Sequence, residues 1–491
     1  MRRTSLARGV SLALLVALLI PSIASAQDAP PDNATIAGNL DLVWVVISAG
    51  LVLFMQAGFL GLEVGFSRGK NVGAGVAKIV INLAIAGIVW WMVGFGFAFG
   101  GTGEFLGTST GFFSGFGSDM SGAASFPLGL YGDSFGGGWS AFHIFQFAFA
   151  AVSLAIVWGT TIERIKFIAM PIFAVVFIGF IYPLIAHWGF GGGFFTNLGG
   201  VQDFAGSTVV HLTGATAAFA ALLVLGPRRG KYTATGEARA IPGHNMPIFG
   251  LGVIILWLGW IGFNGGSTLG VADGRFAEVA VVTNLGAAGG VVGASIVIGL
   301  LTKKLDVGMA GNGAIAGLVA ITAPSGYVEF WAAPIIGLVA GVIVVFGVLA
   351  IDKKLDDPVG ALSAHGLAGI WGTLACGLFT SNRLSEYNGV GQAGLFEGGG
   401  FKQLGTQALG AGSGFLAVFI LSFAVFKLVD VTIGLRVDEA TEDAGLDITE
   451  HGMYGYPEQF IPAPELVGYG AAPTAPPSLS GQLATTKETL A

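Results

Sequence analysis

Two histidines at related positions are the residues of this sequence best placed to do chemistry. His211 ends the segment DFAGSTVVH and His365 ends DPVGALSAH, so each follows an aspartate, Asp203 or Asp357, by eight residues. Both histidines stand in apolar stretches, where a polar ring is costly unless it is paired or faces a cavity. Two rings that meet can share a proton, pass it on or hold an amine. A lone buried histidine usually makes a structural hydrogen bond, but the matched spacing favours a functional pair.

Other site chemistries find little support. No third ligand at helical spacing accompanies either histidine, so we expect no metal site. Cys376 is the only cysteine and lies in an apolar stretch, which excludes an intrachain disulfide and makes redox chemistry unexpected. The sequence has no Walker-type phosphate loop, which disfavours a nucleotide-driven pump. We therefore expect no cofactor and no enzymatic activity.

Aromatic residues recur near the ends of apolar runs. Phe145 and Phe149 are four residues apart, so they share one helix face, with Gln146 beside them. Rings at such positions usually form interfacial belts. Two rings and a hydroxyl such as Ser267 could instead hold a small cation, at roughly 0.5–2 kcal/mol per ring. The other members of this aromatic set are Trp188, Phe190, Trp260 and Phe263.

Two acidic residues have structural as well as functional interpretations. Asp203 precedes Gly206-Ser207-Thr208 and reads first as a helix N-cap. A carboxylate at a pore mouth would also stabilise an approaching cation, so the two roles can coexist. Glu63 lies five residues before Arg68, and we interpret it as the structural partner of a basic residue or a backbone donor.

The composition indicates that lipid surrounds most of the chain. Hydrophobic residues make up 53% of the 491 positions and charged residues 10%, whereas soluble domains have about 25% charged residues. The 82 glycines interrupt long apolar runs, as they do where helices approach closely. Runs of roughly 20 residues, enough for a membrane span, lie near 41–66, 78–99, 140–160, 167–187, 207–226, 247–264, 277–301, 333–350, 361–380 and 404–429, and a shorter run near 309–323 makes eleven.

The basic residues predict the orientation. If the mature N-terminus is outside, most of them fall in connections that face the cytoplasm, and eleven spans leave the C-terminus there as well. We expect a multi-pass protein of a bacterial inner membrane. The net charge of −7 gives no indication of nucleic-acid binding. The cytoplasmic set is Arg68, Lys70, Arg164, Lys166, Arg228, Arg229, Lys231, Arg239, Lys303, Lys304, Lys353 and Lys354, against Arg275, Arg383 and Lys402 outside.

The two histidine segments fall in the fifth and tenth spans. This predicts an all-α integral membrane fold with an inverted five-helix repeat, spans 1–5 and 6–10, plus a final helix. Repeats with an odd number of spans must be inverted, and they place the site at their interface near the membrane midplane. Residues 1–26 have arginines, an apolar run and a small-residue end, as a signal peptide does. We expect a membrane domain at 27–430, a cytoplasmic regulatory segment at 431–460 and a disordered tail at 461–491.

Several longer motifs resemble those of one family. Over about residues 40–455 the chain is similar to ammonium transporters of the Amt/Mep/Rh group, and to the bacterial Amt type in particular. The motifs are MQAGFLGLEVGFSRGKN at 55–71, FQFAFAAVSLAIVWGTTIERIKF at 145–167, DFAGSTVVH at 203–211, GWIGFNGGS at 259–267, GAIAGLVAIT at 313–322 and DDPVGALSAHGLAGIWG at 356–372.

The resemblance implies roles for individual residues. It assigns an outer recognition site and gate, supported by Asp203, and a pore pair formed by His211 and His365. It places Thr322 on the outer route. The recognition site and gate would comprise Phe145, Phe149, Trp260, Phe263 and Ser267.

The resemblance also implies an assembly, and the sequence departs from the family pattern at one position. Relatives are homotrimers with one pore per subunit, and their C-terminal segment, similar to residues 434–452 here, often binds a PII-type regulatory protein. Phe190 stands before a triple glycine where the family usually has tryptophan. A phenylalanine face attracts cations more weakly. The outer site could therefore bind ammonium less tightly, unless Trp188 compensates.

We therefore expect an ammonium transporter. Its cation would be recruited at the outer aromatic site, deprotonated near Asp203 and passed as ammonia along the twin-histidine pore. Two alternatives remain open. The chain could be a passive channel for ammonia or another small neutral solute, or an ammonium sensor acting through a partner.

Overall fold

The computed structural model describes residues 33–101, 103–107, 138–271 and 273–460. The expected signal peptide at 1–26 and tail at 461–491 lie outside the described residues. In the described part, ten helical segments are long and apolar enough to cross a membrane, and the shorter apolar helix Val307–Thr322 makes the eleventh. A helix covers each of the eleven predicted runs, so the predicted fold class is confirmed.

The first five spans form one half of the bundle and the next five the other half. The second and fourth spans are each interrupted by a short π-helical turn where the predicted run is continuous. The fifth and tenth spans each begin with a π-helical turn. The spans are α2 (Asn33–Phe66), α3–η2–α4 (Val72–Val89, Trp90–Gly94, Phe95–Phe99), α5 (Trp139–Gly159), α6–η6–α7 (Ala169–Val176, Phe177–Ile181, Tyr182–Phe190), η7–α9 (Ser207–Leu212, Thr213–Leu225), α10 (Met246–Gly266), α11 (Arg275–Thr302), α12 (Val307–Thr322), α13 (Ala332–Ile351), η9–α14 (Leu362–Leu367, Ala368–Phe379) and the final α16 (Lys402–Ile433).

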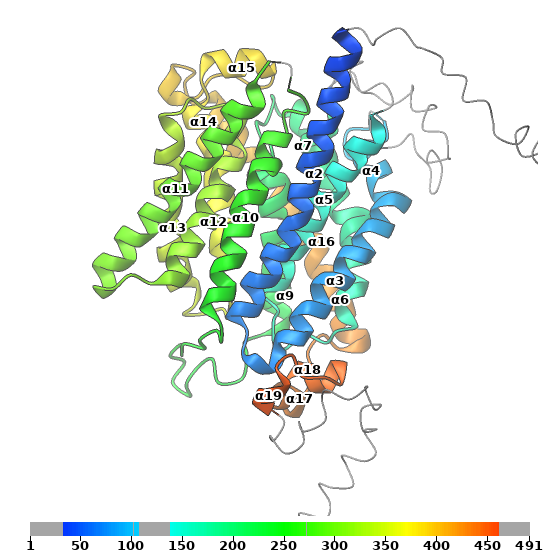
Figure 1. Ribbon diagram of the computed structural model, residues 1–491, viewed down its shortest axis with the longest axis vertical. Helices are drawn as coiled ribbons and strands as arrows, with labels where there is room; N and C mark the ends of the chain where they lie inside the picture. Colours follow the sequence, from blue (N-terminus) through cyan, green and yellow to red (C-terminus); the bar gives the residue numbers. More distant parts are fainter. Residues whose placement is uncertain (1–32, 102, 108–137, 272, 461–491) are drawn as a thin grey trace, which may run out of the picture.

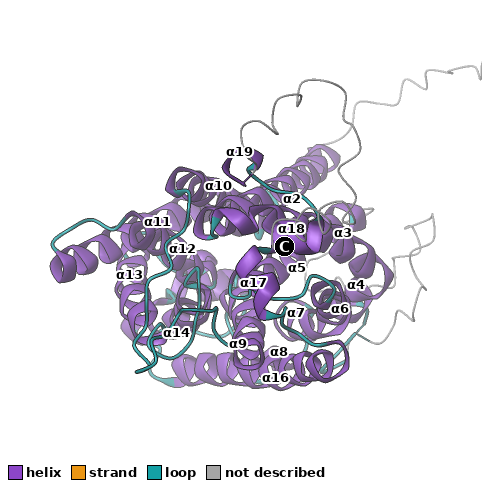
Figure 2. Cartoon of the chain, turned by 90° about the horizontal axis from the view of Figure 1, so that it is seen from below, coloured by secondary structure: helices purple, strands orange, loops and turns teal. Residues whose placement is uncertain are grey.

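Short helices cover the two ends of the bundle (Figure 1). We call the end that carries the C-terminal segment the basal end and the opposite one the distal end. The distal end has α8 (Phe194–Asn197), η8 (Pro324–Gly326), α15 (Asn382–Asn388) and η10 (Leu395–Glu397), and the basal end has η1 (Gly69–Asn71), α17 (Glu439–Ala444), α18 (Leu446–His451) and α19 (Pro457–Phe460). Seen from the basal end, α17 and α18 lie across the bundle and not at its edge (Figure 2).

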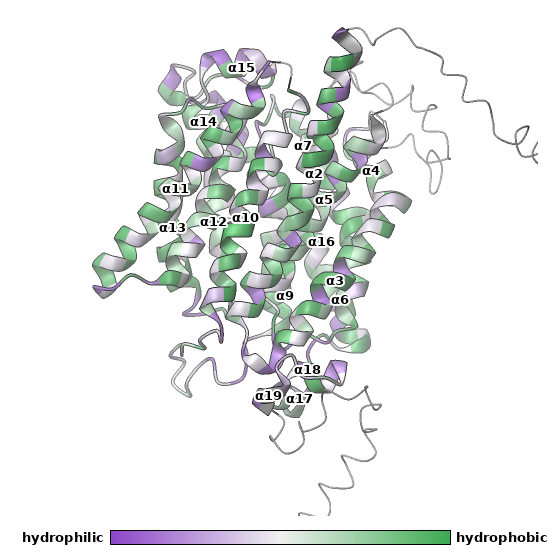
Figure 3. Ribbon diagram, in the orientation of Figure 1, coloured by the Kyte–Doolittle hydropathy of each residue, from purple (hydrophilic) through white to green (hydrophobic). Residues whose placement is uncertain are grey.

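The surface of the bundle is apolar between its ends. Large apolar side chains such as Leu251, Ile254 and Leu300 are exposed, whereas many polar side chains are buried. Hydrophilic residues gather mainly at the two ends of the molecule (Figure 3). This inversion of the usual pattern of water-soluble proteins is what a lipid environment requires, so the chain is a multi-pass membrane protein.

The first helices of the two halves, α2 and α10, pack along one another (Figure 1). Their contact depends on glycine, because a Cβ added at Gly252 would lie 2.6 Å from the carbonyl oxygen of Gly58. Backbones can approach this closely only where side chains are absent. The close contact brings the two halves together around the histidine segments of the fifth and tenth spans.

Candidate functional site

Asp203 binds the first turn of the fifth span. Its carboxylate accepts hydrogen bonds from the backbone N–H groups of four consecutive residues, Gly206 to Val209, at 2.8–2.9 Å. Gly206, with φ of 118°, turns the chain so that these donors converge on the carboxylate. The structure therefore supports the helix-capping role of Asp203. Asp203 also lines a cavity, described below.

Asp357 repeats this arrangement at the tenth span. Its carboxylate accepts from the N–H groups of Ala361 and Leu362 at 3.1 and 2.7 Å. Each aspartate thus holds the start of the helix that carries a histidine. The equal spacing in the sequence corresponds to a similar local structure, with four backbone donors on Asp203 and two on Asp357.

Both histidines lie in π-helical turns, His211 in η7 and His365 in η9. Such turns are frequent at functional sites, because the extra residue displaces a side chain from its place in an α-helix. Here the two rings stack, with centroids 5.3 Å apart and planes 22° apart. Nδ1 of His365 lies 3.2 Å from Nδ1 of His211, and both side chains are buried. The expected meeting of the two rings is present.

Further rings enclose His211. Trp260 stacks on it at 5.1 Å between centroids, and Phe263 lies at 5.5 Å. Nε2 of His211 is buried and has no hydrogen-bond partner among the described residues. A buried polar nitrogen without a partner is costly in an apolar site. It could bind a small polar guest.

A cavity of about 410 Å³ opens at the distal end of the bundle. The cavity is lined by five of the predicted site residues, which are Phe145, Phe149, Phe190, Asp203 and Ser267. Gln146 lines it as well, and its Oε1 has no hydrogen-bond partner among the described residues. The cavity therefore combines aromatic faces with polar acceptors, which is suitable for a small cation.

Aromatic rings fill the route from this cavity to the histidines. Phe149 packs on Phe145 at 4.7 Å and stacks on Phe263 at 3.9 Å between centroids, and all three side chains are buried. Phe263 in turn lies against His211. A solute must displace these rings to reach the histidine pair, so they are placed as a gate would be.

Trp260 and Thr322 support the site from outside the cavity lining, whereas Trp188 lies away from it. Trp260 donates from Nε1 to Thr322 Oγ1 at 2.8 Å, and Thr322 donates to the carbonyl of Leu318. Thr322 thus holds the ring that stacks on His211. Trp188 packs on the rings of Phe194 and Phe195 and donates to the carbonyl of Phe105, away from the described lining of the cavity. The ring presented to the cavity is that of Phe190.

The motifs did not reveal the charged rim of the cavity. Asp41, Asp273 and Arg275 line it, together with Tyr387, which donates to Asp273. Asp41 also accepts from the N–H of Val271 at 2.7 Å. These residues come from three separate parts of the chain, and no motif or spacing connects them, so only the fold could reveal the rim.

Glu63 has the basic partner expected of it. Lys78 of α3 places Nζ 2.6 Å from Glu63 Oε2, and both side chains are buried. The sequence did not indicate which residue this partner would be.

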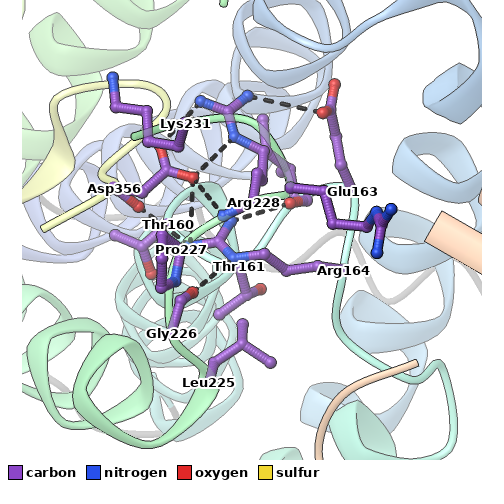
Figure 4. Close-up of polar contacts among 12 residues, drawn as sticks. Thr160, Thr161, Glu163, Arg164, Leu225, Gly226, Pro227, Arg228, Lys231 and Asp356 are labelled. Atoms are coloured by element: carbon purple, nitrogen blue, oxygen red, sulfur yellow. Dashed lines mark hydrogen bonds and ion pairs between the residues drawn. The ribbon is translucent and has the colours of Figure 1, made fainter. Parts of the chain in front are cut away.

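A buried ionic cluster joins the basal connections after α5, α9 and α13 (Figure 4). We call Glu163, Arg164, Arg228 and Asp356 the basal cluster. Arg228 donates from its backbone N and from Nε to Asp356 Oδ2, at 2.8 and 2.9 Å, and from Nη2 to Oδ1 at 2.9 Å. Arg164 donates to the carbonyls of Gly226 and Asp356, each at 2.9 Å. Burial would raise the pKa of Asp356, but the hydrogen bonds from Arg228 and the charge of Arg164 lower it to about 2.

The basal cluster also contacts the connection after α2 and the C-terminal segment. Arg68 donates from N and Nε to the two oxygens of Glu163, at 2.6 and 2.7 Å. The N–H of Val437 donates to the carbonyl of Arg164 at 3.1 Å, and Arg436 pairs with Glu442 at 2.6 Å. Several basic residues expected on one side of the membrane therefore do meet at one end of the bundle.

Comparison with known proteins gives one consistent result. Residues 43–456 match the model of the Ammonium Transporter Family. The chain is similar to ammonium transporter Amt2 of Archaeoglobus fulgidus, at 39% identity over 91% of this chain and 95% of that protein. It is similar to the ammonium transporter of Bacillus subtilis, at 34% identity over 85% and 98%. A solved structure named Sensor Amt Protein superposes with a TM-score of 0.76, at 34% identity over 85% of this chain and 99% of that one. Candida albicans Mep2 superposes with a TM-score of 0.72, at 28% identity over 82% and 87%.

Proposed function

The chain belongs to the ammonium transporter family, and from this premise we propose that it deprotonates ammonium at the distal cavity and passes ammonia along the histidine pair. The observation that carries the proposal is the stacked pair itself. His211 and His365 lie beyond an aromatic gate, with a hydrogen-bonding distance of 3.2 Å between them. They provide a proton path in surroundings that are otherwise apolar.

Selectivity explains why the proton must come off. Potassium resembles ammonium in size and charge, but only ammonium can donate hydrogen bonds and lose a proton. Moving an intact ion into an apolar pore costs many kcal/mol, on the order of tens by Born solvation. A pore that admits neutral ammonia and returns the proton separately excludes potassium.

The distal cavity has the groups that recruitment requires. The faces of Phe145, Phe149 and Phe190 attract a cation. Its rim has the carboxylates of Asp41 and Asp273 and the guanidinium of Arg275, which is paired with Glu278. The remaining negative charge raises the local cation concentration. Asp203 stands at the inner part of this route with four backbone donors on its oxygens. Its charge favours the arriving ion, and deprotonation takes place next to it.

The orientation, location and assembly belong to the same proposal. We place the basal end in the cytoplasm of a bacterial cell and the distal cavity outside, because the basal end collects the basic residues. Family resemblance suggests a homotrimer in the inner membrane. The C-terminal segment on the basal end is then available to a PII-type regulatory protein.

One observation favours a second candidate function. The solved structure that superposes over 99% of its length is named a sensor, so this chain could sense ammonium through a partner. Such a protein would bind ammonium at the distal cavity without moving charge. A passive channel for neutral ammonia would also move no charge, but it would change the internal pH.

The test is the current evoked by an ammonium jump on proteoliposomes that contain the protein, with potassium jumps as the control. A saturable current with ammonium and none with potassium supports the proposal. Ammonium binding without any current would contradict it. An ammonia-driven change of internal pH would then distinguish the channel from the sensor.

A further inference from the structure

A second, smaller cavity lies on the basal side of His365. It has about 20 Å³, and roughly 10–15 Å³ is enough for one water-sized molecule. An ammonium ion is of that size. The lining brings together four spans and the basal loop before the tenth span, and comprises Phe59, Leu62, Glu63, Ile156, Gly159, Asn312, Ile315, Val359, Ala361, Ala364 and His365. The histidine pair therefore stands between two cavities.

Glu63 presents an unused oxygen to this inner cavity. The side chain is 2% exposed, and Oε1 has no hydrogen-bond partner among the described residues. Gly159, which lines the same cavity, lies beside that oxygen, since a Cβ added there would be 3.7 Å from Oε1. A buried carboxylate oxygen without a donor is a large cost unless a guest supplies the hydrogen bond.

Lys78 holds Glu63 from the other side. Its Nζ contacts Oε2 at 2.6 Å and donates to the carbonyl of Trp158 at 3.2 Å. Lys78 does not line the inner cavity among the described residues; it lines a separate pocket beside Asn71 and the C-terminal segment. The ion pair therefore fixes which oxygen of Glu63 faces the cavity.

We propose that Glu63 is the inner counter-charge of the pore, which holds the ammonium that re-forms beside His365 before release. This rests on the proposed function. The proton released outside reaches His365 through the His211–His365 pair. Ammonia then takes it from a ring nitrogen of His365, so that one N–H bond breaks on the ring, one forms on ammonium, and the ring is left neutral. Glu63 Oε1 accepts a hydrogen bond from the new cation. The ring of Phe59, whose centroid is 6.3 Å from that of His365, lines the same cavity.

Two double variants separate the need for an ion pair from the need for a carboxylate at position 63. In Glu63→Gln with Lys78→Gln the pair is neutral, so no unpaired charge is left buried and we expect the fold to be retained. In Glu63→Lys with Lys78→Glu the pair is kept, but the carboxylate moves to the position that faces the other pocket. We expect both double variants to carry an ammonium current reduced at least tenfold, with ammonium binding at the distal cavity unchanged.

The experiment measures ammonium-evoked current on proteoliposomes, thermal unfolding in detergent, and ammonium chloride binding by calorimetry for each protein. The matched control is Lys427→Gln with Asp430→Asn, an exposed pair at 3.3 Å on α16, which should keep the full current. A wild-type current in either Glu63–Lys78 double variant would show that the pair only stabilises the fold. A wild-type protein without ammonium current would instead defeat the proposed function, and the inner site with it.

Discussion

His211 and His365 come from opposite halves of the chain, yet their Nδ1 atoms lie 3.2 Å apart and their rings are nearly parallel. A hydrogen bond between two ring nitrogens requires one proton, so one ring donates while the other accepts. Nε2 of His211 stays without a partner among the described residues. The pair can therefore bind a guest and exchange a proton with it in one place.

The first prediction concerns this pair. We expect His211→Ala with His365→Ala to lower the ammonium current at least tenfold, because the pore then has no path for the proton. His244→Ala, at the basal end, is the control and should keep the current. The measurement is the response to ammonium and potassium jumps on proteoliposomes. If the double variant kept both ammonium transport and potassium exclusion, the histidine mechanism would be wrong.

The second prediction concerns the ring at the distal cavity. Phe190→Trp should lower the apparent KM for ammonium about two- to fivefold, since an indole face binds a cation more strongly, by about 0.5–1 kcal/mol. Phe190 lines the cavity, whereas Trp188 is directed to Phe105 and Phe194. Trp188→Phe should therefore leave the KM unchanged. An equal effect of the two substitutions on concentration-dependent currents would contradict this assignment.

The third prediction concerns the basal cluster and pH. The pKa of Asp356 is lowered to about 2 from 3.8, so its contribution to stability is complete above pH 3.8 and is lost as the pH falls towards 2. We expect Asp356→Asn to lower the free energy of unfolding at pH 7 by about 2 kcal/mol. Thermal unfolding in detergent at pH 7, 5 and 3 should show a difference from wild type that shrinks only at the lowest pH. Asp430→Asn, at a partly exposed position, is the control. A difference that grew on acidification would refute the linkage.

The fourth prediction concerns the packing of α11 against α13. A Cβ added at Gly337 would overlap the carbonyl oxygen of Gly286. Gly337→Ala should therefore separate the two helices and destabilise the protein by about 1–3 kcal/mol. Gly299→Ala, also on α11 and with nothing within 4 Å of its added Cβ, should not. Melting temperatures in detergent measure both, and equal values for the two variants would contradict the packing.

Much of the fold followed from local information in the sequence. Lipid favours long apolar runs, and each run was readable without knowledge of its neighbours. The eleven spans were therefore predicted, including the short one that became α12. The spacing of Asp203 to His211 and of Asp357 to His365 was also local, because each aspartate binds the first turn of its own helix.

Contacts between distant segments could not be predicted in this way. The sequence indicated that Glu63 has a basic partner, but Lys78 was identified only by the packing of α2 on α3. The basal cluster needs the loops after three spans and the C-terminal segment at one point. Sequence motifs relate residues that are close together along the chain, so they do not predict contacts between such distant loops.

The sequence by itself determined the set of membrane helices, because hydropathy and helix capping act over a few residues. Its motifs also identified the family and the residues able to do chemistry. Only the tertiary structure decided which side chains face a cavity. It presented Phe190 to the distal cavity in place of Trp188, brought two histidines from separate halves within hydrogen-bonding distance, and left one oxygen of Glu63 free beside a second cavity. These outcomes depend on how the helices rotate and approach when they pack, and that is set by contacts between residues far apart in the chain.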